Sequence, residues 1–455
     1  MKKMLFGTNG IRGVINVDLT PEFVTKIGMA LGAYFSGKEI LVGCDCRLGN
    51  YMIKSAVVSG LISSGCSVSD AELIPTPALQ YAVKYYGFDG GVIITASHNP
   101  PEYNGIKVVG ENGIELPREE EIKIEEIFFE EKFKLVEWRK LRGVSRAPNV
   151  IDPYIEAIEK HVDLEAIRKK KFRIVVDSGN GVSVLTVPKL LQNLGCEVSV
   201  INAELDGTFP SRPPEPKPEN LNLLCEAVRS FKADFGVAFD GDGDRAIFVD
   251  EKGTVHWGDK SFALIEDWFL RKNKNKIVVT PVSSSTLIED VAKAHGGKIY
   301  WTKVGSIVVS HTMVKIGALL GGEENGGVFY GLHQPVRDGA MTTALILEIL
   351  TEENKSLSEL ISKLPEYYIV KASVPCPEEI KEEVLEELKK RLKAPRMETI
   401  DGIKLWFSDG RSILIRPSGT EPKYRLYAEA RSEEEALKLV EEYSNLVRKI
   451  VKMKK

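Results

Sequence analysis

The sequence predicts an α/β protein of several domains: three α/β units with mixed sheets, then a C-terminal α+β unit, around a central cleft. The chain has 455 residues, which corresponds to about two to four domains. Short β-rich runs alternate with amphipathic helical stretches, as in βαβ units. In each of the first three units an apolar run ends in a polar loop. Ligands of open α/β sheets bind beyond the carboxyl ends of strands, so we expect one cleft fed by several domains.

The first unit is expected to span residues 1–150. Residues 39–44 and 90–95 are predicted to be strands, since both are short and apolar. Residues 51–65 are predicted to be a helix that ends at a glycine. The charged stretch 118–142 is predicted to be a surface helix followed by an exit linker.

The second unit is expected to span residues 151–252. Residues 172–177 and 235–239 are typical of buried strands. Between them, residues 206–220 are rich in proline and are predicted to form a long irregular loop.

The third unit is expected to span residues 253–365 and to begin its sheet with a strand at 277–280. The fourth, residues 366–455, is predicted to be small and antiparallel and to close with a helix at 432–449. Its expected strands are 404–407, 412–415 and 424–430.

Composition excludes several classes of protein. Hydrophobic residues make up 43% and charged residues 28%, so the chain is neither disordered nor collagen-like. The net charge of −4 gives no indication of binding to nucleic acid or to a membrane surface. The six cysteines are scattered, as expected of reduced thiols. No apolar run approaches the roughly 18 residues of a membrane span, and we expect no signal peptide in the first residues. We therefore expect a cytoplasmic enzyme.

The segment Thr95–Lys107 (TASHNPPEYNGIK) places a serine hydroxyl where a buried strand ends. Serine attacks as a nucleophile only when a neighbour takes its proton or cations stabilise the anion forming on it. His98 and Lys107, close to Ser97, could do either. The alternative is a plain turn, because Ser-x-Asn-Pro starts turns and the Asn-Gly pair at Asn104 makes tight ones.

Three carboxylates, Asp240, Asp242 and Asp244, alternate with glycines directly after a predicted strand. Such hard oxygen ligands can converge on Mg²⁺ or Mn²⁺. Without a cation they would repel one another, which disfavours the alternative of a solvated acidic turn. A calcium EF-hand loop is disfavoured because Arg245 occupies the position of its invariant glycine. An aspartyl-phosphate phosphatase, with Asp240 as nucleophile, would carry threonine where Asp244 stands.

Two further segments suit a phosphosugar. Arg416-Pro417-Ser418-Gly419-Thr420, with Arg425 just after it, offers guanidinium forks, hydroxyls and backbone N–H groups for a phosphate. The loop Gly322–Gly327 (GEENGG) carries carboxylate and amide side chains that suit sugar hydroxyls. A hairpin turn and an ordinary loop are the respective alternatives. The turn Phe6–Gly13 holds Arg12 but lacks the Gly-Lys-Ser/Thr of a P-loop.

Taken together, these segments resemble the α-D-phosphohexomutase superfamily, in its branch of archaeal and bacterial phosphomannomutase/phosphoglucomutase and phosphoglucosamine mutase. The resemblance covers essentially the whole chain. The patterns T-A-S-H-N-P-x-x-Y-N-G-x-K and D-G-D-x-D-R match without a break. F-G-T-x-G-x-R-G, R-x-S-G-T-E-P and R-D-G-A, the last at Arg337–Ala340, also match.

The resemblance implies four domains around one cleft and a phosphoserine at Ser97. It implies one Mg²⁺ per chain, held by an oxygen of that phosphoserine and by Asp240, Asp242 and Asp244. It also implies that phosphoryl transfer and acid/base chemistry are supported by Arg12, His98 and Lys107. The implied substrate-binding residues are Arg245, Glu323, Asn325, Arg416, Ser418, Gly419, Thr420 and Arg425.

Two departures from the family pattern affect which site residues can be assigned from the resemblance. The family's G-R-D-x-R-x-S appears as GCDCRLG at residues 43–49, so only Arg47 is carried over there. The sugar loop commonly ends in Ser-Gly-His, but here reads Asn325-Gly326-Gly327, which leaves the preferred sugar open.

The activity implied by the resemblance interconverts hexose 1-phosphate and hexose 6-phosphate, with glucose and mannose phosphates as substrates. It passes through a phosphoserine enzyme and a 1,6-bisphosphate, and glucose 1,6-bisphosphate would be the activator. The alternative within the superfamily is phosphoglucosamine mutase. The expected partner is a phosphosugar substrate, and a homo-oligomer is left open. Neither nucleic acid nor a membrane is expected as a partner. The rivals are a phosphatase and a sugar-phosphate-binding protein without activity.

Overall fold

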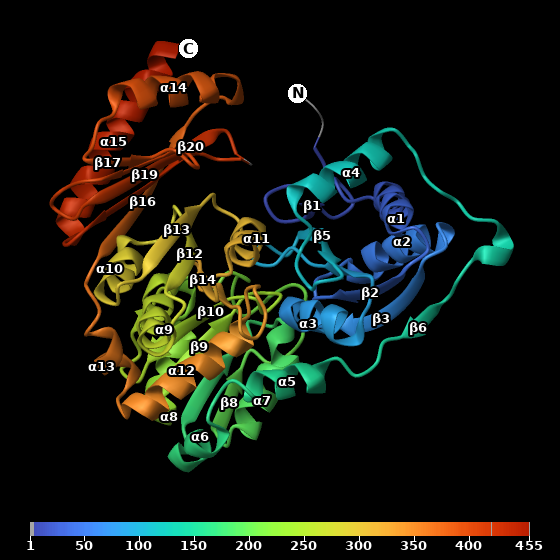
Figure 1. The fold of residues 1–455 in the computed structure, drawn as a ribbon, viewed down its shortest axis with the longest axis horizontal. Coiled ribbons are helices and arrows are strands. Elements are labelled where there is room, and N and C mark those ends of the chain that lie inside the picture. The colour runs from blue at the N-terminus through green and yellow to red at the C-terminus, as the bar shows by residue number, and fades with distance from the viewer. Residues whose placement is uncertain (1–3, 420, 455) are drawn as a thin grey trace.

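A computed structural model describes residues 4–419 and 421–454 of the chain. Figure 1 shows four domains: the first and last face each other across the upper part of the view, and the second and third lie below and between them. The first three are α/β domains with mixed sheets, and the fourth has an antiparallel sheet, so the predicted fold class is confirmed. None of the described helices is long and apolar enough to span a membrane.

The first domain is built on a six-stranded sheet of order β1-β5-β4-β2-β3-β6. Its central strands β2 and β4 are buried apolar runs, except for the exposed Glu39 at the start of β2, as expected where helices cover both faces. Strand β5 runs antiparallel to β4 and to β1, which makes the sheet mixed. The strands are β1 (Ile11–Val14), β2 (Glu39–Cys44), β3 (Ser67–Leu73), β4 (Gly90–Ile94), β5 (Tyr103–Gly110) and β6 (Val144–Arg146). The helices are α1 (Pro21–Phe35), α2 (Asn50–Ser63), α3 (Thr76–Tyr86) and α4 (Arg118–Phe129).

The second domain has a five-stranded sheet of order β11-β10-β9-β7-β8. Strands β7, β8 and β9 are parallel, and a hairpin turns β9 back into the antiparallel β10. The strands are β7 (Arg173–Asp177), β8 (Glu197–Ile201), β9 (Phe235–Phe239), β10 (Ala246–Asp250) and β11 (Val255–His256). The helices are α5 (Ile151–Glu159), α6 (Leu164–Lys170), α7 (Val187–Asn193) and α8 (Asn222–Phe231).

The third domain has a four-stranded sheet of order β13-β12-β14-β15. Helix α12 is buried throughout most of its length, and it packs against helices of the second and third domains. The strands are β12 (Ile277–Pro281), β13 (Lys298–Thr302), β14 (Leu320–Gly322) and β15 (Val328–Tyr330). The helices are α9 (Gly258–Lys272), α10 (Thr286–Ala294), α11 (Ser306–Ile316), α12 (Gly339–Glu353) and α13 (Leu357–Ile361).

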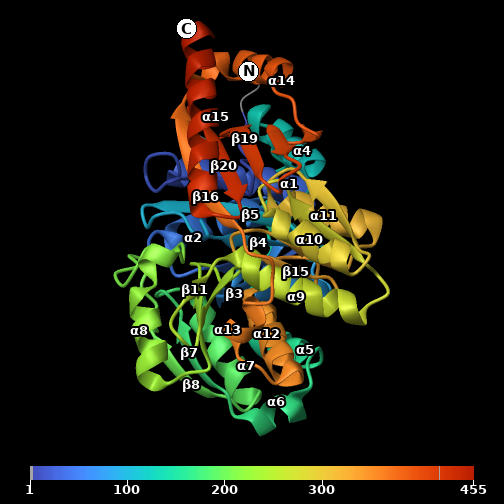
Figure 2. The same cartoon turned by 90° about the vertical axis from the view of Figure 1, so that its left-hand side faces the viewer.

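The fourth domain is a five-stranded antiparallel sheet of order β16-β20-β19-β18-β17, with two helices on it. Figure 2 shows the long helix α15 running beside this sheet. The strands are β16 (Tyr368–Pro375), β17 (Arg396–Glu398), β18 (Ile403–Trp406), β19 (Ser412–Pro417) and β20 (Lys423–Ala430). The helices are α14 (Lys381–Arg391) and α15 (Glu433–Lys454).

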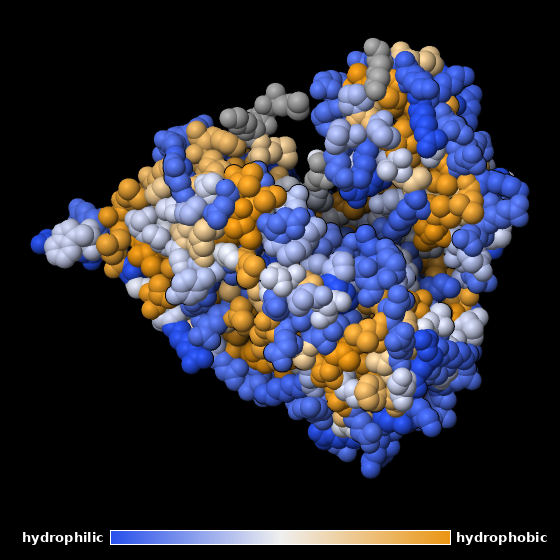
Figure 3. Space-filling view, turned by 180° about the vertical axis from the view of Figure 1, so that it is seen from behind, coloured by the Kyte–Doolittle hydropathy of each residue, from blue (hydrophilic) through white to orange (hydrophobic). Residues whose placement is uncertain are grey.

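The hydrophobic cores show how the domains are joined. One core cluster is continuous from α3 of the first domain through the second domain into α9 and α12 of the third. The other face of the first domain's sheet packs in a second core, and the fourth domain has a core of its own. A small cluster joins it to the third domain through Val282, Trp301, Trp406 and Leu414. The first three domains therefore form one packed body, and the fourth is attached to it. Figure 3 shows the surface hollowed between the first and fourth domains.

The turn considered at Asn104 is not formed. Asn104 and Gly105 lie inside β5, where a Cβ on Gly105 would come within 2.6 Å of the Ile11 and Thr95 carbonyl oxygens. This glycine is required by the close approach of neighbouring backbones. The predicted surface helix at 118–142 ends at Phe129, and the rest is the exposed linker to β6. The domain boundaries after residues 150, 252 and 365 stay predictions.

Candidate active site

Ser97 follows β4 at the carboxyl edge of the first sheet. Its backbone is left-handed, with φ +52°, a conformation that non-glycine residues rarely adopt. The side chain is fully buried, and its hydroxyl donates to Asp240 Oδ2 at 2.7 Å. The backbone N–H of Ser97 donates to the Thr95 hydroxyl at 2.9 Å. The hydroxyl is thus held at the junction of the first two domains.

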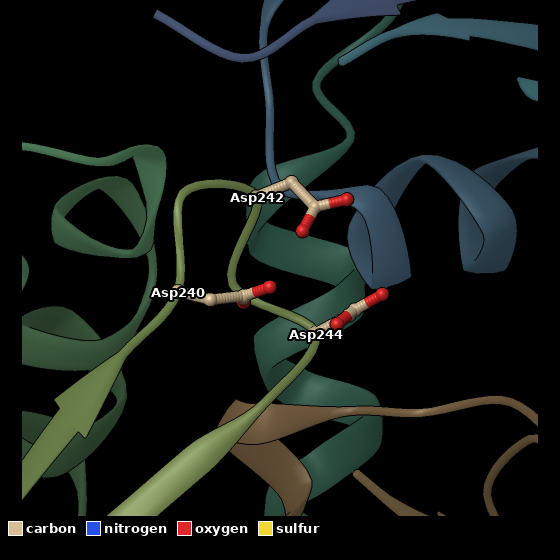
Figure 4. A group of neighbouring side chains, drawn as sticks. All are labelled: Asp240, Asp242 and Asp244. Carbon is tan, nitrogen blue, oxygen red and sulfur yellow. The ribbon is translucent and has the colours of Figure 1, made fainter. Parts of the chain in front are cut away.

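The three aspartates lie on the loop that joins β9 to β10. Figure 4 shows their carboxylates turned into the same space beside this loop. One carboxylate oxygen from each lies within 4.8 Å of the others, and all three residues are buried. Burial, together with Asp244 and Asp242, raises the pKa of Asp240 to about 8. Burial also opposes ionisation of Asp242, yet Lys107 and a hydrogen bond from Thr76 lower its pKa below the ordinary value.

These residues fit a divalent cation. Asp242 Oδ1 and Asp244 Oδ1 are buried and have no hydrogen-bond partner among the described residues. Buried carboxylate oxygens are costly to leave unpaired, and a cation that binds all three side chains would remove both the cost and the mutual repulsion. An all-oxygen donor set is the one that Mg²⁺ and Mn²⁺ prefer.

Lys107 lies on β5 and crosses from the first domain to the aspartate loop. Its Nζ is 2.9 Å from Asp242 Oδ2 and 3.5 Å from Asp244 Oδ2. Glu115 Oε1 lies 3.5 Å away on the other side. Burial opposes the charge, but these three carboxylates raise the pKa of Lys107. Lys107 is therefore held as a cation inside the site.

His98 and Arg12 border the serine. His98 Nδ1 is 3.5 Å from the Ser97 hydroxyl oxygen. Burial and the nearby Arg245, Arg12 and Arg337 guanidinium groups lower the pKa of His98 well below 6.5, so the imidazole is neutral at pH 7. Arg12, on β1, donates to the Ala96 carbonyl at 3.1 Å, while burial lowers its pKa to about 10.

The sugar loop is tied to the aspartate loop through Arg337. The Arg337 guanidinium donates to Glu323 Oε2 at 3.1 Å and to Asp244 Oδ2 at 2.5 Å. Asn325 accepts from the N–H of Gly327 at 3.2 Å, which shapes the loop. Arg245 is buried, and its Nε has no hydrogen-bond partner among the described residues, which leaves a donor for a ligand.

The described members of the predicted phosphate-binding set lie in the fourth domain: Arg416 is on β19, Arg425 is on β20, and Ser418 and Gly419 are in the turn between these strands. Arg416 pairs with Asp401 at 2.9 Å, and Arg425 pairs with Glu421 at 2.6 Å. A Cβ on Gly419 would have no heavy atom within 4 Å. Ser418 is buried next to it. Thr420 lies outside the described residues.

The structure thus brings most of the predicted residues into one cluster. The cluster contains Arg12, Ser97, His98, Lys107, Asp240, Asp242, Asp244, Arg245 and Glu323, with Asn325 on the adjoining loop. Among the described residues, no hydrogen bond or ion pair joins Arg416, Ser418, Gly419 or Arg425 to this cluster, and all four lie in the fourth domain.

Three contacting residues were missed by sequence reasoning. Thr76, at the start of α3, donates from its hydroxyl to Asp242 Oδ2 at 2.7 Å. Glu115 and Arg337 hold Lys107 and Asp244 as described above. Only Arg337 had a signal, the R-D-G-A pattern, and no role was attached to it. Gln80, Glu115, Asp244 and Arg337 also border a small cavity of about 10 Å³, room for one water molecule.

Comparison with known families agrees with this architecture. Four profiles of the phosphoglucomutase/phosphomannomutase family match in order. Its alpha/beta/alpha domains I, II and III match residues 3–135, 152–253 and 257–368. Its C-terminal domain matches residues 372–446.

Individual relatives agree as well. A phosphoglucomutase/phosphomannomutase of Thermococcus kodakarensis is 47% identical over 96% of this chain and 97% of its own. A phosphoglucosamine/phosphogalactosamine mutase of Sulfurisphaera tokodaii is 46% identical over 97% of this chain and 99% of its own. The crystal structure of a phosphoglucomutase/phosphomannomutase family protein from Burkholderia thailandensis superposes with a TM-score of 0.88 at 28% identity, covering 98% and 97% of the two chains. The chain therefore belongs to the phosphoglucomutase/phosphomannomutase family.

Proposed function

We propose that this phosphohexomutase interconverts the 1-phosphate and 6-phosphate of glucose and mannose through a phosphoserine at Ser97. One observation carries the proposal: the buried Ser97 hydroxyl faces a carboxylate of the aspartate cluster at 2.7 Å. A serine in this position can receive a phosphoryl group beside a cation site while neighbouring cations neutralise the charge.

The proposed reaction has two transfers. The phosphoryl group of phospho-Ser97 passes to the 6-hydroxyl of a hexose 1-phosphate, which gives up its proton and becomes a 1,6-bisphosphate. The bisphosphate turns round, and its 1-phosphoryl group returns to the Ser97 oxygen, leaving the 6-phosphate. Arg12, His98 and Lys107 surround the serine and would supply positive charge and proton transfer.

One Mg²⁺ per chain would be held by Asp240, Asp242, Asp244 and an oxygen on Ser97. When bound, it supplies Lewis-acid stabilisation of the charge on the transferring phosphoryl group. Arg416, Ser418, Gly419, Thr420 and Arg425 would hold the phosphate that is not reacting. A phosphate site on the fourth domain can bind either end of the bisphosphate. Movement of this domain toward the cluster would exclude water from the reacting groups.

Glucosamine phosphate is the second candidate substrate. One observation favours it: the Sulfurisphaera tokodaii relative, 46% identical, is named a phosphoglucosamine/phosphogalactosamine mutase. The sugar loop, which ends in Asn325-Gly326-Gly327, leaves the preferred sugar open. We further propose glucose 1,6-bisphosphate as activator and a cytoplasmic location. An assembly of identical chains is compatible with this function.

Phosphorus NMR with a substrate panel tests the proposal. The protein receives Mg²⁺, a trace of glucose 1,6-bisphosphate and, separately, the 1-phosphates of glucose, mannose, glucosamine and N-acetylglucosamine. We expect the 6-phosphate to appear without free phosphate, fastest with glucose or mannose. Faster turnover of glucosamine 1-phosphate would move the assignment to the second candidate. Free phosphate alone would exclude a mutase and point to a phosphatase that uses Asp240.

A further inference from the structure

Arg47 is a buried arginine that the reaction described above does not use. It is one of the largest fully buried side chains in the described part of the chain, and its guanidinium has no exposed surface. A buried guanidinium is costly unless every N–H group is paired. The hydrogen-bond acceptors of the Arg47 guanidinium therefore indicate its role.

All five N–H groups of this guanidinium are accounted for. Nε donates to Asp45 Oδ2 at 3.1 Å. The other four donors reach backbone carbonyls of residues 95–103, the segment after β4 that carries Ser97 and is called the serine loop below. Their acceptors are the carbonyl oxygens of Ser97 at 2.6 Å, Asn99 at 2.6 Å, Pro100 at 2.7 Å and Tyr103 at 3.1 Å.

Asp45 connects Arg47 to the N–H side of Ser97 through hydrogen bonds. Besides Arg47, it accepts from the Thr95 hydroxyl at 2.5 Å. That same hydroxyl accepts from the Ser97 N–H. The Ser97 residue is therefore held at its N–H through Thr95 and at its carbonyl through Arg47, on both sides of its left-handed backbone.

The second domain closes over this arrangement. The Phe209 ring lies 4.9 Å from the guanidinium carbon of Arg47. A Cβ on Gly241, between two of the aspartates, would lie 2.6 Å from the Ser97 carbonyl oxygen and 3.5 Å from Arg47 Nη2. The same guanidinium thus binds the serine loop and lies next to the aspartate loop.

We propose that Arg47 is the positioning residue for the phosphoryl-carrying serine. It fixes the left-handed backbone that directs the Ser97 hydroxyl at the aspartate cluster. It also binds four carbonyl oxygens that would otherwise be free to face an anionic phosphoryl group. This inference rests on the proposed function, because it assigns Arg47 to the transfer step and not to substrate binding.

The test compares Arg47→Lys and Thr95→Val with the wild-type chain. Lysine keeps the charge but has only three donors, and valine keeps the shape of threonine without its hydroxyl. Single-turnover phosphoryl uptake from labelled glucose 1,6-bisphosphate gives the transfer rate, and steady-state assays give KM. We expect each folded variant to transfer at least tenfold more slowly, and Arg47→Lys on the order of a hundredfold, with KM changed less than threefold. Arg118→Lys, the same change at a distant ion-paired arginine of the first domain, should leave both parameters unchanged.

Hydrogen exchange of the peptide covering residues 95–104 gives a readout that does not need activity. Exchange should quicken in this peptide in Arg47→Lys and Thr95→Val, and not in Arg118→Lys. A folded variant that transfers at the wild-type rate, or whose peptide exchanges as slowly as in the wild-type chain, would overturn the inference. If Arg47→Lys does not fold, the same two measurements on Thr95→Val test the inference. Absence of phosphoryl uptake by the wild-type chain would instead refute the proposed function and leave the exchange result to decide the role of Arg47.

Discussion

Ser97 and Asp240 lie 143 positions apart in the chain, yet the serine hydroxyl donates to the aspartate carboxylate at 2.7 Å. Each residue comes from the carboxyl end of a strand, β4 in the first domain and β9 in the second. The contact exists only because the two sheets share a packed core. The chemistry that we propose therefore depends on the junction between two domains.

Replacing Ser97 by alanine should abolish phosphoryl transfer while leaving the fold intact, because only a small hydroxyl is lost. Incubation with labelled glucose 1,6-bisphosphate should label the wild-type chain but not Ser97→Ala. Ser444→Ala is the matched control, because Ser444 in α15 is also buried and its hydroxyl has no hydrogen-bond partner among the described residues. Label retained in Ser97→Ala would place the phosphoryl group on another residue.

Mg²⁺ should stabilise the fold against heat, because the cation relieves repulsion among three buried carboxylates. At a concentration one hundred times Kd, the gain in free energy of unfolding should be about 2.7 kcal/mol. A Tm scan with Mg²⁺ and with EDTA measures it. The shift should be lost in Asp240→Asn and kept in Asp267→Asn, whose carboxylate pairs with Arg271 on α9. An equal shift in both variants would place the cation elsewhere.

Arg425→Gln should weaken substrate binding more than transfer. A charge-assisted hydrogen bond contributes about 1.5–3 kcal/mol, so KM should rise on the order of ten- to a hundredfold. Labelling of Ser97 at saturating bisphosphate should change little. Arg411→Gln, at the β18–β19 turn of the same domain, should behave as the wild-type chain. A fall in kcat at unchanged KM would argue against a binding role for Arg425.

Glu266 should make the fold less stable as pH rises. It is fully buried in α9, and neither carboxylate oxygen has a hydrogen-bond partner among the described residues. Burial, and to a smaller extent Asp267, raises the pKa of Glu266 well above 4.5. The folded chain therefore keeps a proton that the unfolded chain releases above about pH 4.5, and stability falls with pH from there up to the raised pKa.

Glu266→Gln removes this penalty. Its advantage over the wild-type chain in free energy of unfolding should grow with pH by up to about 1.4 kcal/mol per unit. Denaturant midpoints at pH 5, 6, 7 and 8 give the slope. The exposed Glu226→Gln should run parallel to the wild-type chain. Parallel curves for Glu266→Gln would show that the carboxyl is ionised in the fold.

The sequence was most informative where chemistry and position coincide in one short segment. Ser97 and the three aspartates follow apolar strands directly, so their place at the sheet edge could be predicted from local pattern. Strand bounds agreed closely for the same reason, for example 39–44 and 235–239. Antiparallel β5 was not foreseen, because its Asn104 and Gly105 have the composition of a turn.

Contacts that depend on tertiary packing could not be predicted. The Thr76 hydroxyl donates to Asp242 across a domain junction, and no pattern in the sequence around Thr76 predicts this contact. Glu115 belongs to no motif, yet it borders Lys107. Arg47 was carried over from a family pattern, but the four carbonyls that it binds became visible only in the fold.

The division of the hydrophobic core has a consequence for how the molecule melts. Domains that share one continuous core lose their packing together, whereas a domain with a separate core can open alone. Differential scanning calorimetry should therefore resolve two endotherms, one from the three-domain body and one from residues of the fourth domain. A phosphosugar that bridges the hollow would bind both units and draw the endotherms together.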